Sequence, residues 1–232
     1  MIKTVLLFDI DGTLLLTGGA GQIAIDQAFE ELFGVADAWG NCHPDGKTDA
    51  IIFQEIAQEA LGRDLSAQEL KDFIQAYTDR FPQALLDSSN FRLMPGVVQL
   101  LDKLSAMPEL LLGVATGNVQ DTSWMKLKHA KLDHYFSFGG FGCDSSVRAE
   151  IIAAAMQRAG DKGAKAVSPN QYYIIGDTPK DIACAKANDA KCIAVATGSY
   201  ALDELNTHQP EHVLIDLTDH TNFLDIIGVE AK

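Results

Sequence analysis

The chain has 232 residues, of which 47% are hydrophobic and 22% are charged, close to the averages of soluble globular proteins. Its 32 acidic residues outnumber its 18 basic residues, so the formal net charge is −14. Because nucleic acids and anionic membrane surfaces are held mainly by Lys and Arg, we expect neither as a partner. An anionic ligand would need a metal ion or a few focused cations at its site.

The chain carries no sign of membrane insertion or secretion. No apolar run reaches the ~18 residues that cross a bilayer, and the first apolar segment, Val5 to Phe8, is short and followed by carboxylates, unlike a signal peptide. The four cysteines show no CxxC spacing, which is typical of reduced, mostly buried residues. We therefore expect a cytoplasmic protein.

Short apolar runs alternate with segments of helical pattern over most of the chain. Continuously apolar runs are typical of parallel strands that are covered on both faces. The runs are 2–8, 110–115, 172–175, 192–196 and 213–215. This alternation predicts an α/β fold with a doubly wound parallel sheet and a Rossmann-like core.

Residues from about 15 to 90 interrupt the alternation, because only helical patterns occur there. One apolar stripe includes Phe29 and Leu32, and a longer one follows Ser66 and Glu69, which have the spacing of a capping box. We predict a helical cap of residues 17–91, inserted after the first strand of an α/β core of residues 1–16 and 92–232. The alternative is a single domain with a few surface helices.

Polar motifs follow three of the predicted strands. Ligands of open parallel sheets bind beyond the carboxyl ends of the strands, so these motifs should share one rim. The motifs are Asp9-Ile10-Asp11-Gly12-Thr13, Thr116-Gly117-Asn118 and Gly176-Asp177-Thr178-Pro179-Lys180-Asp181.

Asp9 and Asp11 are two residues apart, which in an extended chain places both carboxylates on the same side. Their repulsion requires either a divalent cation or a bound proton. Asp177 at another strand end would complete an oxygen cage of the kind that Mg²⁺ uses. The alternative is that Asp9 and Asp11 are turn and cap residues around Gly12.

The other two motifs also have two interpretations. Thr116-Gly117-Asn118 precedes a helical segment whose free N–H groups would bind phosphate, although Asn118 could be an ordinary cap. Asp181 lies near the strand end with Asp177, although Thr178, as an N-cap, would place Asp181 at the capping-box position.

Arg148 lies in the first turn of a predicted helix, 146–159. A cation there is opposed by the helix dipole, which indicates an anionic partner. The alternative is a surface residue beside Glu150.

These motifs, in this order, resemble those of the haloacid dehalogenase-like hydrolase superfamily, most of all its phosphoglycolate phosphatase and β-phosphoglucomutase branch. The resemblance covers nearly the whole chain and includes the helical cap after the first strand. It implies that Asp9 is the nucleophile that forms an aspartyl-phosphate. Asp11 would be the acid for the leaving alcohol and then the base for water.

The resemblance also implies a metal and a phosphate site. Mg²⁺ would be held by Asp9, the backbone carbonyl of Asp11 and Asp177, with support from Asp181. The phosphoryl oxygens would be held by Thr116 and the N–H groups of Gly117 and Asn118. The chain departs from the family pattern at the third motif, usually Lys and often followed by Pro. Arg148 occupies about that place.

The cap contributes a further candidate. Gly46-Lys47-Thr48-Asp49 precedes a helical segment, and the resemblance implies that this region of the cap faces the active site. Lys47 is therefore a candidate substrate-binding residue. The alternative is an exposed loop with Thr48 as N-cap.

We expect a Mg²⁺-dependent phosphatase that acts on a small phosphorylated metabolite and is a monomer or homodimer. A phosphomutase of the same superfamily remains open, because it uses the same acid and base. Asp11 disfavours a dehalogenase and a phosphonoacetaldehyde hydrolase, whose family patterns differ there. The intact set of Asp residues disfavours a phospho-Asp signalling module or a binding protein without activity.

Overall fold

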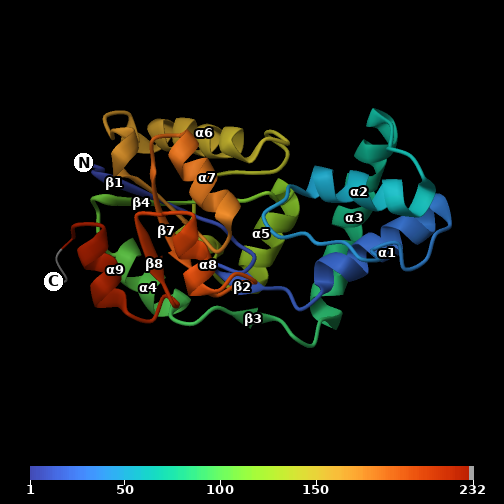
Figure 1. Cartoon of the computed structure of the whole chain (residues 1–232), viewed down its shortest axis with the longest axis horizontal. Helices are drawn as coiled ribbons and strands as arrows, with labels where there is room; N and C mark the ends of the chain where they lie inside the picture. Colours follow the sequence, from blue (N-terminus) through green and yellow to red (C-terminus); the bar gives the residue numbers. More distant parts are fainter. Residues whose placement is uncertain (230–232) are drawn as a thin grey trace.

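A parallel sheet is the centre of the computed structural model, which describes residues 1–229 (Figure 1). Within those residues the sheet has six strands in the order β5-β4-β1-β6-β7-β8, and every neighbouring pair is parallel. The strands are β1 (Thr4–Phe8), β4 (Leu110–Ala115), β5 (Gly139–Gly140), β6 (Tyr172–Gly176), β7 (Lys191–Val195) and β8 (His212–Leu214). The predicted doubly wound α/β fold is confirmed.

Each of the five predicted strands is present, with bounds within two residues of those expected from the sequence. The edge strand β5 was not predicted, because two glycines carry no apolar signal. Their small size has a packing reason, since a Cβ atom on Gly140 would lie 2.1 Å from the carbonyl oxygen of Ile151.

The alternation of side chains along β1 distributes the helices between the two faces of the sheet. Val5 and Leu7 pack into one apolar cluster, and Leu6 and Phe8 pack into the other. Burial on both faces explains why the strand is continuously apolar. The helices of the first face are α6 (Arg148–Ala159), α7 (Pro179–Ala187) and α8 (Leu202–Thr207), and those of the second are α4 (Val97–Ser105), α5 (Gln120–His129) and α9 (His220–Ile226) (Figure 1).

Three helices form a separate body at the other end of the molecule (Figure 1): α1 (Ala20–Phe33), α2 (Asp49–Leu61) and α3 (Ala67–Asp87). They have their own apolar cluster, in which Phe53, Phe73 and Tyr77 meet edge to face. The predicted capping box of Ser66 and Glu69 opens α3. Leu32, expected in the apolar stripe of α1, is 38% exposed.

The chain passes between the two parts through a short antiparallel pair, β2 (Leu15–Leu16) and β3 (Arg92–Leu93). The Ser88 hydroxyl also donates to the carbonyl of Thr17, at 2.6 Å, so the two connections are joined beyond the strands. The division of the chain into a core and a cap of residues 17–91 remains our proposal, and this arrangement supports it.

Two simpler expectations concern hydropathy and cysteines. No helix within residues 1–229 has the length and hydropathy needed to cross a membrane. All four cysteines are free, and Cys184 and Cys192 are buried as expected, whereas Cys143 is exposed and Cys42 is partly buried.

Candidate active site

The three polar motifs meet at the carboxyl end of β1. This strand lies between β4 and β6, because the chain builds the sheet outward from β1 on one side and then on the other. Ligand sites of open α/β sheets lie at such a switch point. Asp9 directly follows β1, and its N–H donates to the carbonyl of Ile175 in β6 at 2.8 Å.

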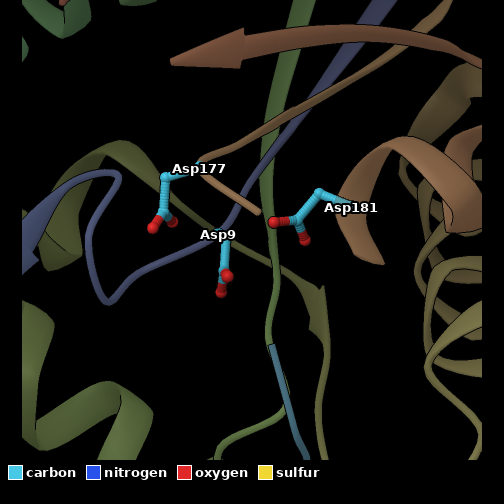
Figure 2. A group of neighbouring side chains, drawn as sticks. All are labelled: Asp9, Asp177 and Asp181. Atoms are coloured by element: carbon cyan, nitrogen blue, oxygen red, sulfur yellow. The ribbon is translucent and has the colours of Figure 1, made fainter. Parts of the chain in front are cut away.

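Three buried carboxylates converge there. Asp9, Asp177 and Asp181 each offer an oxygen, and these oxygens lie within 4.8 Å of one another (Figure 2). Burial raises the pKa of Asp9 to about 6, although Arg148 opposes the rise. Three carboxylates at this separation could hold a metal ion.

The Asp177 carboxylate is held by a hydrogen bond from a side chain and by the close approach of two glycines. The Thr13 hydroxyl donates to its Oδ1 at 3.0 Å. A Cβ atom on Gly12 or Gly198 would lie 2.3 or 1.8 Å from its Oδ2, so only glycine fits at both positions. Burial, together with the negative charges of Asp181 and Asp9, raises the pKa of Asp177 to about 8. A divalent cation would relieve this repulsion.

Arg148 is the cation of this cluster. Its side chain is 9% exposed, and Nη2 lies 2.5 Å from Asp9 Oδ2 and 2.6 Å from Asp181 Oδ1. The alternative of a surface arginine is therefore wrong. Burial lowers the pKa of Arg148, but Asp181 and Asp9 more than compensate, and the net pKa is raised. These two carboxylates explain why a cation can begin α6 against the helix dipole.

Asp181 caps a helix and also belongs to the carboxylate cluster. Its Oδ2 accepts from the N–H and hydroxyl of Thr178, at 3.1 and 2.8 Å, and the two residues form the capping box of α7. Its Oδ1 pairs with Arg148. The capping box of α7 thereby holds the Asp181 carboxylate in the orientation that positions Arg148 against Asp9.

Asp11 lies apart from this cluster. Its side chain is 37% exposed, whereas Asp9 is 8% exposed. Its Oδ2 accepts from the Asn118 amide at 2.8 Å and from the Lys126 ammonium at 2.6 Å. The two carboxylates of the first motif therefore have different partners.

None of the three motifs includes Lys126, so the sequence did not predict it as a site residue. It lies on α5 with a side chain that is 5% exposed. In the sequence, Lys126 comes four residues after Thr122 in the helix that follows the second motif, so the two side chains fall on one face of that helix. The structure shows that this face is buried.

Thr116, Gly117 and Asn118 form the turn between β4 and α5. The Thr116 hydroxyl is buried and accepts from the Asn118 amide at 2.7 Å. A Cβ atom on Gly117 would lie 2.3 Å from the carbonyl oxygen of Lys47, so this turn contacts the cap loop closely. The N-cap of α5 is Val119, so the alternative role of Asn118 as an ordinary cap is wrong.

The cap loop 46–49 lies over this turn. Asp49 donates its N–H to the Gly117 carbonyl at 2.8 Å, and its Oδ2 accepts from the Val119 N–H at 2.7 Å. Thr48 is 1% exposed, and its hydroxyl has no hydrogen-bond partner among the described residues. The alternative of an exposed loop is therefore wrong, although Thr48 does occupy the N-cap position of α2.

A cavity of about 260 Å³ lies between the cap and the core. Lys47 lines it, 2.5 Å from Glu55 Oε2, with its side chain 23% exposed. The core side of the wall includes Asp9, Asp11, Asn118, Lys126, Arg148 and Asp177, and the cap side includes Ile25, Trp39, Ile52 and Tyr77. Asp9, Asp11 and Lys47 thus face one cavity.

Comparisons with known proteins identify the fold and the family. One curated relative is the probable phosphatase IndB of Dickeya dadantii (strain 3937), 24% identical over 231 residues, which are 98% of this chain and 93% of the relative. A solved hydrolase from Pseudomonas syringae is 23% identical with a TM-score of 0.71, and covers 96% of this chain and 98% of its own.

A predicted phosphoglycolate phosphatase from Haemophilus somnus 129pt is 20% identical to this chain with a TM-score of 0.70. The match covers 96% of this chain and 97% of the Haemophilus chain. CbbY from Rhodobacter sphaeroides, solved in complex with phosphate, is 21% identical with a TM-score of 0.68, over 94% of this chain and 96% of its own. These structures share the fold. Residues 6–195 match the family model of haloacid dehalogenase-like hydrolases, and the chain belongs to that family.

Proposed function

We propose that the protein is a Mg²⁺-dependent phosphatase that hydrolyses a small phosphorylated metabolite through an aspartyl-phosphate on Asp9. The observation that carries this proposal is the position of Asp9, buried at the carboxyl end of β1 and paired with Arg148 at 2.5 Å, beside Asp177 and Asp181. Carboxylate nucleophiles and positioned cations are what phosphoryl transfer by covalent catalysis requires.

The donor set suits Mg²⁺. Asp9, Asp177 and the backbone carbonyl of Asp11 would hold it, because Mg²⁺ prefers oxygen ligands and few carboxylates. The backbone cradle around Asp177 and its pKa of about 8 both fit a carboxylate that is built to face a cation. When bound, Mg²⁺ neutralises phosphoryl charge and so allows the anionic nucleophile to approach.

The residues of the chain then divide the reaction. An oxygen of Asp9 forms a bond to phosphorus while the bond to the leaving oxygen breaks, and Asp11 donates a proton to that oxygen. Asp11 next accepts a proton from water as the water attacks phosphorus and releases Asp9. Arg148, the Thr116 hydroxyl and the N–H groups of Gly117 and Asn118 would stabilise the phosphoryl oxygens.

The cavity between cap and core supports a small substrate. Asp9, Asp11 and Lys47 all line it, so a metabolite bound there would be partly shielded from bulk water during transfer. Lys47 also lines the cavity and pairs with Glu55; in this proposal it would contact a distal part of the substrate rather than the reacting phosphoryl group.

A phosphate-release screen over sugar phosphates, phosphoglycolate and nucleotides, with Mg²⁺ or with EDTA, tests this proposal. We expect release that requires Mg²⁺ and that falls at least about 10³-fold in Asp9→Asn, since the amide keeps the shape but is no nucleophile. Asp203→Asn, at an exposed position of the core, is the matched control. Full activity in EDTA, or an active Asp9→Asn variant, would contradict the proposal. A phosphomutase would return an isomeric phosphate ester instead of inorganic phosphate.

A further inference from the structure

Lys126 is a buried cation for which the mechanism above has no role. Its side chain is 5% exposed, and the ammonium donates to Asp11 Oδ2 at 2.6 Å and to Asn118 Oδ1. Burial of an ammonium is costly unless it is paired and hydrogen-bonded. The contacts of Lys126 therefore indicate which groups the chain has positioned it to serve.

Those contacts distinguish the two oxygens of Asp11. Oδ2 accepts from Lys126 and also from the Asn118 amide at 2.8 Å. Within residues 1–229, no hydrogen bond engages Oδ1. Because Asp11 lines the cavity and is 37% exposed, Oδ1 is the oxygen left to exchange a proton with a group bound there.

We infer that Lys126 is a positioning residue for proton transfer by Asp11, an inference that rests on the proposed phosphatase function. Because two donors hold Oδ2, Oδ1 is the oxygen that faces the bound group and exchanges the proton with it. In the first step the Oδ1–H bond breaks, and an O–H bond forms on the leaving oxygen as it separates from phosphorus. In the second step Oδ1 takes a proton from the attacking water.

The surroundings of Lys126 shield its ammonium from water. The ring of Phe81, on cap helix α3, lies under the ammonium with its centroid 5.7 Å away. Phe81 is fully buried in the apolar cluster of the cap. Ion pairs and hydrogen bonds are stronger where water is excluded, so the Lys126–Asp11 contact is well suited to fix the carboxylate.

Asn118 extends the arrangement to the phosphate-binding turn. Its amide donates both to Asp11 and to the Thr116 hydroxyl, at 2.8 and 2.7 Å, while its carbonyl accepts from Lys126. Lys126 therefore sets the orientation of the Asn118 amide and, through it, the distance between the proton-transfer oxygen and the turn that holds the phosphoryl group.

The opposing interpretation is that Lys126 only compensates buried negative charge and stabilises the fold. The two roles differ in one kinetic property. A residue that acts through proton transfer matters most when the leaving group is a poor one, such as an alkoxide. A residue that only stabilises the fold lowers the activity toward every phosphate ester by the same factor.

The first experiment compares Lys126→Met with Lys128→Met, an exposed lysine on the same helix. For an alkyl phosphate found in the screen, we expect a 10- to 100-fold lower kcat in Lys126→Met with little change in KM, as expected for a misplaced catalytic group. For p-nitrophenyl phosphate we expect less than about a threefold loss, because its leaving group needs little protonation. Equal losses for both esters, or equal behaviour of the two variants, would overturn the inference.

The second experiment is a double-mutant cycle with Asp11→Asn. If Lys126 acts through Asp11, adding Lys126→Met to Asp11→Asn lowers kcat for the alkyl phosphate less than about twofold further. Losses that multiply would overturn the inference. If Lys126→Met does not show a cooperative unfolding transition and is therefore not folded, the same comparison of esters is made with Lys126→Arg. Loss confined to the alkyl phosphate then supports the inference, and equal loss for both esters overturns it.

The two proposals fail in different ways. Absence of any phosphate release by the unaltered protein would overturn both. Mg²⁺-dependent release that is abolished in Asp9→Asn but insensitive to Lys126→Met would leave the proposed function in place and overturn the role of Lys126 alone.

Discussion

Asp49 offers a test of the contact between cap and core that depends on pH. This carboxyl begins α2, is buried, and accepts from the Val119 N–H at 2.7 Å. Burial raises its pKa from 3.8 to about 6, although Lys126 and the hydrogen bond from Val119 oppose the rise. The folded protein therefore keeps a proton on Asp49 over a pH range in which the unfolded chain has lost it.

This difference in proton binding between the folded and unfolded states determines how the free energy of unfolding depends on pH. Because the folded state binds the proton more tightly, Asp49 contributes most to stability below about pH 4, and this contribution is lost as the pH rises through about 6. An increase in pKa from 3.8 to about 6 corresponds to about 3 kcal/mol of unfolding free energy. About 2 kcal/mol of this loss falls between about pH 4.5 and 8.

Asp49→Asn removes the ionisation and keeps an oxygen that can accept from Val119. We expect the variant to gain about 2 kcal/mol relative to the unaltered protein as the pH rises from about 4.5 to 8. Urea unfolding at each pH in EDTA, followed by the fluorescence of Trp39 and Trp124, measures this difference. The other buried carboxylates are common to both proteins and cancel. Asp45→Asn, at an exposed position four residues earlier, should show no such change. A difference that is independent of pH, or one that favours the unaltered protein at high pH, would refute the reasoning.

Two further predictions concern catalysis. Arg148→Ala should lower kcat by about 10²–10³-fold, the usual cost of a lost donor to the transferring group; the exposed Arg92→Ala is its control, and comparable small losses in steady-state assays would return Arg148 to a structural role. Lys47→Ala should lower kcat/KM for the metabolite found in the screen by a factor that corresponds to about 1–3 kcal/mol of activation free energy, as for a lost charge-assisted hydrogen bond. It should leave kcat/KM for p-nitrophenyl phosphate unchanged. Equal damage to both substrates would contradict a specificity role for Lys47.

The sheet was predictable because its strands are buried on both faces. Val5 to Phe8 alternate between two apolar clusters, so every position is apolar and the run is visible in the sequence. The motifs after β1, β4 and β6 were predictable as one site, because parallel strands of a doubly wound sheet end on the same rim. Topology therefore brought Asp9 and Asp177, 168 positions apart in the numbering, to one place.

Side-chain partners on different elements were not predictable in the same way. Lys126 on α5 belongs to none of the motifs, and Asp49 on α2 belonged to the cap candidate only as a neighbour of Lys47. Each has its partner on another element, Asp11 and Val119 respectively. Such contacts depend on how the helices pack against the strand ends and against one another. Periodicity within a single helix indicates which side is buried, but not what that side meets.

In the first motif, the rule that residues i and i+2 point to the same side does not apply, because the motif lies beyond the end of the strand. The expectation that Asp9 and Asp11 repel on a common side rests on extended geometry, but β1 ends at Phe8, and Gly12 turns the chain with a φ of +81°. Asp9 turns toward Asp177, Asp181 and Arg148, while Asp11 turns toward Asn118 and Lys126.

Each carboxylate of the first motif thus has its own cation. Asp9 is buried and paired with an arginine that also binds Asp181, as the proposed nucleophile requires. Asp11 is partly exposed and is held through one oxygen, which leaves the other for the proposed proton transfer. In a chain of net charge −14, two buried cations at neighbouring carboxylates can give the two carboxylates of the proposed mechanism different properties, because the local partner of each carboxylate outweighs the distant field of the whole protein.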